Sequence, residues 1–157
     1  MTRALPPGLY GFDQLAPGDH LLTDWADVTA EAIDRFADLS GDRFEIHQSD
    51  VGAARHGFPA QVAHGLLVLA LVEGLKSQSP VQLGTFAALG WDWSFRQPVF
   101  ADDRIRAHFT VKAKRAATAD KGVLTLTVSV ENQNAEIVQR GEARLMAYRQ
   151  RQSLKPK

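Results

Sequence analysis

Residues 63–76 read AHGLLVLALVEGLK, and this stretch decides the fold class. At helical spacing the segment is apolar on nearly every side, with charge only at Glu73 and Lys76. A helix of this kind is normally a buried one. At about 14 residues it would be roughly 20 Å long, so the rest of the chain must supply an apolar surface that wraps around it.

Four later segments predict that surface, because each alternates apolar and polar residues like a strand with one apolar face. Turn signals at Pro98, at Asp120 to Gly122 and at Asn132 to Asn134 separate the segments, and short connections favour antiparallel pairing. We therefore predict an α+β protein in which the helix packs on an antiparallel sheet. The four predicted strands are residues 87–96, 105–114, 123–130 and 142–147.

The first of these strands carries three aromatic residues at alternating positions. Trp91, Trp93 and Phe95 should share one face of the sheet, and we expect them in the core, with a subunit interface as the alternative. The apolar face of this strand is predicted to consist of Ala87, Leu89, Trp91, Trp93 and Phe95.

Two helices are predicted before the apolar segment. Thr29 is a good N-cap for an amphipathic helix that runs to Ser40, and Gly41 is a natural terminator in the left-handed conformation. Ser49 can cap a second, short helix that ends near Arg55. These helices flank a short loop.

The two ends of the chain carry weaker signals. Residues 1–9 are rich in Pro and Gly and are expected to be irregular, and residues 10–25 are expected to hold an extended segment or edge strand. Residues 150–157 are polar and basic and are expected to fray.

The loop between the two predicted helices contains the candidate acid and base. Asp42 lies just past the first helix, and His47 follows five residues later. Catalytic groups are often held on a loop beside a rigid element, and histidine suits base work because an imidazole can exchange a proton near neutral pH. On this spacing alone, Asp42 could simply turn the chain and His47 could be a loop residue with structural partners.

Composition excludes several classes of function. The 18 basic residues equal the 18 acidic residues, so nothing in the net charge favours binding to nucleic acid or to an anionic membrane. The absence of Cys excludes disulfides, Cys-ligated zinc and thiol nucleophiles, and the five His show no metal-ligand spacing, so no metal is expected. The longest apolar run, Leu66 to Val72, is far shorter than the roughly 20 residues of a membrane span, and residues 1–11 lack the apolar core of a signal peptide. We expect one cytoplasmic domain over residues 1–157.

The stretch from Phe36 to Gly65 resembles the signature of the MaoC-like dehydratases, the (R)-specific enoyl-CoA hydratase group of hot-dog proteins. The family pattern runs approximately F-A-x-L-S/T-G-D-x-N-P-x-H-x-D, followed by an Ala, a Phe and I/V-A-H-G. A second match, Phe95 to Phe100 with Asp103 and Ile105, resembles F-x-x-P-V-F-x-G-D-x-I/L. The resemblance covers about residues 12–149 and implies a hot-dog fold, with the sheet wrapped around a buried central helix. The residues that match the first pattern are Phe36-Ala37, Leu39-Ser40-Gly41-Asp42, His47, Ala53, Phe58 and Val62-Ala63-His64-Gly65.

The resemblance implies a role for each residue of the site. Asp42 and His47 would hold the reacting water, with His47 taking its proton and Asp42 orienting the water or handling the α-proton. The backbone N–H of Gly65 would face the thioester oxygen, although this glycine could equally serve tight packing. Ala63 and His64 are expected on the substrate side, with His64 mainly supporting the start of the helix.

The implied activity is the reversible addition of water to a trans-2-enoyl-CoA, giving a (3R)-3-hydroxyacyl-CoA. It needs no metal or redox cofactor, because coenzyme A is part of the substrate. The resemblance also implies a homodimer or higher homo-oligomer with its sites near the interface.

One departure from the family pattern concerns substrate binding, because Phe44 and Glu45 stand where the family has Asn-Pro. Phe44 is therefore a candidate substrate-binding residue that could narrow the acyl pocket, or it could merely fill the space left by Asn. A hot-dog acyl-CoA thioesterase and a non-catalytic acyl-thioester-binding protein are the alternative functions, the second of them motivated by this departure.

Overall fold

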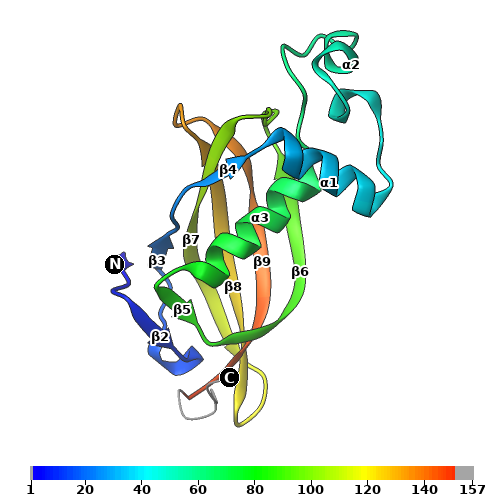
Figure 1. The fold of residues 1–157 in the computed structure, drawn as a ribbon. Coiled ribbons are helices and arrows are strands. Elements are labelled where there is room, and N and C mark those ends of the chain that lie inside the picture. Colours follow the sequence, from blue (N-terminus) through cyan, green and yellow to red (C-terminus); the bar gives the residue numbers. More distant parts are fainter. Residues whose placement is uncertain (1, 151–157) are drawn as a thin grey trace.

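The computed structural model describes residues 2–150, and in it helix α3 (Gly65–Gln78) lies across one face of a curved sheet (Figure 1). The strand order is β1-β3-β7-β8-β9-β6, and β4 also pairs with β7. All pairs along this path are antiparallel except β1 with β3. This is the hot-dog arrangement, so the predicted fold class is confirmed. The strands are β1 (Arg3–Ala4), β3 (Asp19–Leu22), β4 (Ala26–Val28), β6 (Thr85–Phe95), β7 (Asp103–Ala116), β8 (Lys121–Asn132) and β9 (Ile137–Tyr148).

Strand β8 lies inside the sheet, between β7 and β9, and alternates buried and more exposed residues along its length. Its even-numbered apolar side chains are all buried, while the residues between them are more exposed. Strand β7 follows the same rule with its odd-numbered positions as far as Val111. A register shift lies between Val111 and Ala113, and Ala113 is exposed, so the predicted alternation was wrong at this position. The predicted strands are therefore confirmed, and the buried side chains of these two strands include Ile105, Ala107, Phe109, Val111, Leu124, Leu126, Val128 and Val130.

Strand β6 departs from the predicted alternation. Its pairing with β9 shifts register between Thr85 and Ala87 and again between Ala88 and Gly90. As a result Ala88 pairs with the buried Leu145, so Ala88 rather than Ala87 shares the face of Trp91. The predicted face was wrong at this end of the strand, because an inserted residue reverses every side chain that precedes it.

The aromatic residues of β6 are only partly in the core. Trp93 packs against the core, whereas Trp91 and Phe95 are 42% and 57% exposed. The core prediction was therefore wrong for these two residues. The reason is topological, since β6 is the last strand of the sheet path and, within residues 2–150, has a neighbouring strand on one side only.

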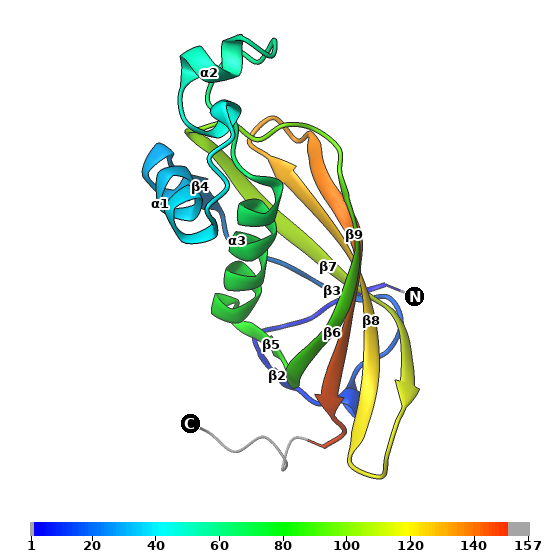
Figure 2. The same cartoon turned by 90° about the vertical axis from the view of Figure 1, so that its right-hand side faces the viewer.

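Helix α3 is also less enclosed than its composition predicts. Leu67, Val68, Val72 and Leu75 are buried against the sheet, but Leu66 is 62% exposed. The sheet covers one side of the helix, as the two views at right angles show (Figures 1 and 2). The side of α3 that faces away from the sheet therefore leaves apolar side chains such as Leu66 exposed.

The helices before α3 follow their capping signals. Helix α1 (Ala30–Ser40) begins where the Thr29 hydroxyl accepts a hydrogen bond from the Ala32 N–H, and it ends at Gly41 with φ of 79°. Helix α2 (Asp50–Ala54) begins where the Ser49 hydroxyl accepts from the Gly52 N–H. Both predictions are confirmed. A short 3-10 helix, η2 (Glu45–His47), precedes α2, and together they project past the end of the sheet (Figure 2).

The N-terminal segment is more regular than expected. Strand β1 pairs in parallel with β3, and β2 (Gly8–Tyr10) pairs with β5 (Val81–Leu83) in a second small sheet. A 3-10 helix, η1 (Phe12–Gln14), follows β2. The prediction of irregular structure was wrong because strands of two or three residues are too short to show a period and depend on distant partners. The frayed tail expected over 150–157 lies, apart from Gln150, outside the described residues.

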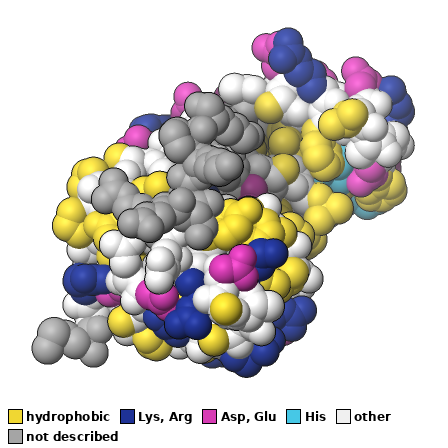
Figure 3. All heavy atoms as spheres, turned by 90° about the horizontal axis from the view of Figure 1, so that it is seen from below, with side chains coloured by type: hydrophobic (Ala, Val, Ile, Leu, Met, Phe, Trp, Pro, Cys, Tyr) yellow, Lys and Arg dark blue, Asp and Glu magenta, His cyan; other side chains and the backbone are white. Residues whose placement is uncertain are grey.

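The surface seen from below Figure 1 is mixed in character. Acidic and basic side chains lie among small apolar patches on the face seen from below (Figure 3), which fits the equal numbers of the two charges. Across residues 2–150, no helix combines the length and apolar character needed to cross a bilayer.

Candidate active site

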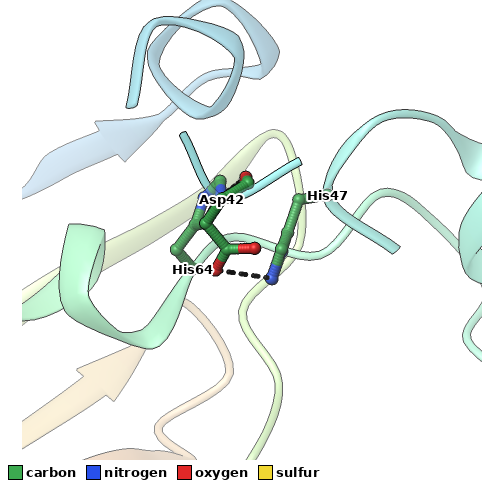
Figure 4. A group of neighbouring side chains, drawn as sticks. All are labelled: Asp42, His47 and His64. Carbon is green, nitrogen blue, oxygen red and sulfur yellow. Dashed lines mark hydrogen bonds and ion pairs between the residues drawn. The ribbon is translucent and has the colours of Figure 1, made fainter. Parts of the chain in front are cut away.

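Asp42, His47 and His64 come together where the loop after α1 meets the start of α3 (Figure 4). The distance from His47 Nε2 to Asp42 Oδ2 is 4.0 Å. The rings of His47 and His64 are stacked, with centroids 3.8 Å apart and planes 20° apart. His64 is buried and His47 is largely buried, whereas the Asp42 side chain is half-exposed. The structure thus unites the acid and the base that the sequence separates by five residues.

The hydrogen bond at the other ring nitrogen fixes the orientation of His47. Its Nδ1 lies 2.7 Å from the carbonyl oxygen of Val62. A carbonyl oxygen only accepts, so Nδ1 carries the hydrogen and, in the neutral ring, the lone pair is on Nε2. Nε2, which carries the lone pair, is the nitrogen that faces the Asp42 carboxylate. A gap of 4.0 Å is too long for a direct hydrogen bond but suits one oxygen atom bonded to both groups.

The backbone around His47 is held by a residue that the sequence did not single out. The buried Gln61 donates from Nε2 to the carbonyl oxygen of His47 at 2.7 Å and to Asp34 Oδ1 at 3.0 Å. Asp34 belongs to α1, so this amide ties η2 to the helix that precedes the loop. An isolated Gln in no motif gives no local signal for such a role.

His64 supports Asp42 from the opposite side. Its Nε2 lies 2.9 Å from the Asp42 carbonyl oxygen, so this nitrogen is the donor and Nδ1 is an acceptor in the neutral ring. Nδ1 is buried and has no hydrogen-bond partner among the described residues. The Asp42 carboxylate itself accepts from the Phe44 N–H at 3.3 Å. His64 therefore contacts both members of the candidate acid–base pair, one through its ring face and one through its N–H.

The same three residues also meet a geometric requirement for holding a metal ion. One ligand atom from each lies within 4.8 Å of the others, which the spacing of His along the sequence did not predict. The stacked rings argue for another use, because each lone pair lies in the plane of its own ring, and two nearly parallel planes do not meet at one ion beside the rings. The arrangement fits proton transfer better than coordination.

Gly65 begins α3, and both roles considered for it have a structural basis. His64, the N-cap, makes no side-chain capping bond, and the Gly65 N–H has no hydrogen-bond partner among the described residues. A Cβ on Gly65 would lie only 2.6 Å from Phe95 Cζ, closer than real contacts allow. A side chain at this position would therefore force the Phe95 ring to move, and the Gly65 N–H remains available at the positive end of a helix.

A cavity of about 310 Å³ opens beside these groups. Of the six predicted site residues, His47, Ala63 and Gly65 line it, whereas Asp42, Phe44 and His64 do not. Apolar residues from the loop before α3 and from the end of β6 form much of its wall. The full lining is His47, Phe58, Val62, Ala63, Gly65, Val68, Phe95, Arg96, Gln97, Pro98, Val99 and Gln139.

Phe44 and Glu45, the departure from the family pattern, face α2 instead. Phe44 is 53% exposed, and its ring centroid lies 5.2 Å from that of His56. Glu45 accepts hydrogen bonds from Arg55 and pairs with His56, and these contacts, that of Arg55 foremost, hold the pKa of Glu45 below its ordinary value. Glu45 therefore links η2 to the residues that follow α2 through its contacts with Arg55 and His56.

A larger cavity, of about 520 Å³, lies beside β1, β3 and β7. Its lining includes His20, Arg106 and His108, and none of the six predicted site residues. Size alone would favour it, but the smaller cavity is the better candidate for the site, because it joins a base, a free helix N-terminus and an apolar wall.

The chain is similar in sequence and in fold to several known proteins. The model of the MaoC like domain family matches residues 13–134. The chain is 34% identical over 114 residues to the (R)-specific enoyl-CoA hydratase of Aeromonas caviae, a match covering 73% of this chain and 82% of that protein. Among solved structures, a monoamine oxidase regulatory protein from Archaeoglobus fulgius has a TM-score of 0.82 at 27% identity, covering 96% of this chain and 99% of that one. An R-hydratase from Pseudomonas aeruginosa has a TM-score of 0.75 at 26% identity, covering 89% and 86% of the two chains.

Proposed function

Because the chain belongs to the MaoC-like domain family, we propose that it is a hydro-lyase that reversibly adds water to a trans-2-enoyl-CoA. One observation carries this proposal: the lone pair of His47 Nε2 and the Asp42 carboxylate face each other across 4.0 Å, and His47 lines the adjoining cavity. The name of the Aeromonas caviae relative, an (R)-specific enoyl-CoA hydratase, supports the reaction and the (3R) product.

The hydration step follows from these positions. Water held between the two side chains loses a proton to His47 Nε2 while its oxygen bonds to Cβ, and the electron pair of the double bond moves through Cα onto the thioester oxygen. The Gly65 N–H stabilises that developing oxyanion, an effect worth about 3 kcal/mol for one such donor. Asp42 accepts the second hydrogen bond of the water. The acid–base pair then delivers that proton to Cα and regains its original protonation state. The product has gained the atoms of one water, with the hydroxyl on Cβ and the hydrogen on Cα.

The same proposal includes a homodimer. Strand β6 ends the sheet path, so its outer backbone groups have no neighbouring strand among the described residues. Exposed apolar side chains follow this edge, and a second copy would cover them and remove the edge. Because Phe95 lines the cavity, the partner would lie beside the site. The exposed apolar residues of β6 are Phe86, Leu89, Trp91 and Phe95.

The test follows the ultraviolet absorbance of the enoyl thioester after protein is added to short- and medium-chain trans-2-enoyl-CoAs. We expect the absorbance to fall with the wild type and to stay constant with Asp42→Asn and with His47→Gln. Asp38→Asn and His56→Gln are matched controls, since both residues lie near the loop but do not line the cavity. Release of free thiol would instead identify a thioesterase, and binding without turnover would identify a non-catalytic acyl-thioester-binding protein.

A further inference from the structure

Gln139 of β9 forms a buried bridge between the sheet and the start of α3. The residue is 2% exposed. Its Oε1 accepts a hydrogen bond from Trp93 Nε1 at 2.9 Å, and its Nε2 donates to the Gly65 carbonyl oxygen at 3.0 Å. An amide buried among apolar side chains is costly unless it is hydrogen-bonded, so the two bonds stabilise each other's geometry.

The orientation of this amide is fixed by its partners. The Trp93 indole N–H can only donate, and a backbone carbonyl can only accept. The oxygen of Gln139 must therefore face Trp93, and its NH₂ group must face Gly65. The amide connects β6, β9 and α3, and Gln139 also lines the cavity that contains His47.

We propose that Gln139, held in place by Trp93, is a positioning residue for the thioester carbonyl in the hydration reaction. Its bond fixes the plane of the peptide that joins Gly65 to Leu66, and with it the direction of the Leu66 N–H. Because this peptide meets the His64–Gly65 peptide at the Gly65 Cα, the bond also restrains the backbone that carries the Gly65 N–H. His64 supplies no side-chain cap to this turn. Oxyanion donors must lie within tenths of an ångström of their target, and a displacement of about 1 Å can cost on the order of 100-fold in rate. The inference rests on the proposed function.

Two variants test this role with enoyl-CoA as substrate. Gln139→Leu removes both hydrogen bonds at similar volume, and Trp93→Phe removes the indole N–H together with part of the ring but leaves the Gln139 amide in place. We expect kcat to fall about 10- to 100-fold in the first and by a smaller factor in the second, with KM changing less than about threefold. The control is Thr23→Val, which removes a buried hydrogen bond between the Thr23 hydroxyl and the Ala107 N–H, away from α3, and should leave kcat unchanged.

A second readout does not depend on turnover. In nuclear magnetic resonance spectra, the amide signals of Gly65 and Leu66 should shift in Trp93→Phe and in Gln139→Leu but not in Thr23→Val. Unchanged signals would overturn the inference, as would a folded Gln139→Leu protein with wild-type kcat. It would also be overturned if Thr23→Val lost kcat to the same extent as Gln139→Leu at an equal loss of thermal stability. If the wild type itself fails to hydrate any enoyl-CoA, the proposed function and this inference both fall; if it is active and only Gln139 proves irrelevant, the inference alone falls.

Discussion

His64 lies face to face with His47, with the two ring centroids 3.8 Å apart, and the same His64 donates its Nε2–H to the backbone carbonyl of Asp42. One buried imidazole thus sets the position of both the acid and the base. We expect His64→Phe, which keeps a ring in the stack but removes the donor, to lower kcat about 10- to 100-fold. Steady-state hydration of an enoyl-CoA measures this effect.

The matched control for that experiment is His56→Phe, because His56 also forms an aromatic pair, with Phe44, but lies outside the cavity lining. Circular dichroism should show that both variants fold. Wild-type kcat in a folded His64→Phe protein would mean that the hydrogen bond to Asp42 does not position the carboxylate.

Gly65 of α3 lies against the ring of Phe95 of β6. A methyl group on Gly65 would meet the Phe95 ring at 2.6 Å, so Gly65→Ala should lower the free energy of unfolding by about 1–3 kcal/mol through overpacking. Trimming the ring relieves the clash, and the double variant Gly65→Ala/Phe95→Leu should recover much of this loss. Urea unfolding of the two single variants and the double variant measures the coupling. Strictly additive effects would show that the contact does not limit this position.

Phe44 occupies the place of the family Asn, and from sequence alone its replacement by Asn should raise activity if the ring restricts the site. The structure predicts a smaller effect, because the ring packs on His56 and does not line the cavity. We expect Phe44→Asn to change kcat/KM for short-chain enoyl-CoAs by less than about threefold. A clear gain would mean that Phe44 narrows the entrance to the site.

Local signals explain which parts of the fold were predictable. Thr29, Gly41 and Ser49 act on backbone groups three or four residues away, and each helix boundary that they predict is confirmed. The alternation of β8 likewise needs no partner to be recognised. The register shifts of β6 and the two-residue pairing of β1 depend on strands far away in sequence, so nothing local indicates them.

The same distinction applies to the site. The motif around Asp42 and His47 predicted which residues meet, and the capping position of Gly65 follows from the start of the apolar helix. Gln61 and Gln139 belong to no motif, and their bonds reach 14 and 74 residues along the chain. Residues that position a site through such distant contacts become visible only when the fold is known.

The outer edge of β6 leads to a prediction about assembly. Trp91 is 42% exposed beside an unpaired edge, so Trp91→Glu should place a charge in the proposed dimer interface and shift the protein from dimer to monomer. Light scattering coupled to size-exclusion chromatography measures the mass of each variant. Leu39→Glu is the control, because Leu39 is an exposed apolar residue on α1. A wild-type protein that is monomeric at all concentrations would contradict the dimer.

The pairing of Arg3 with Asp19 joins β1 to β3 and should make stability depend on pH. The buried Asp19 carboxylate accepts from Arg3 Nε at 2.8 Å, from Arg3 Nη2 at 2.6 Å and from the Ala16 N–H at 2.9 Å, and these bonds, those of Arg3 foremost, hold its pKa below the ordinary value. A carboxyl group with a lowered pKa contributes stability above its unfolded pKa of about 3.9, and loses that contribution as the pH falls through the folded value.

Asp19→Asn should therefore lower the free energy of unfolding by about 1–3 kcal/mol at pH 7, and the difference from the wild type should shrink below about pH 4. Urea unfolding at a series of pH values measures both quantities, and a difference that stays constant into the acid range would show that the carboxylate charge is not what stabilises this contact.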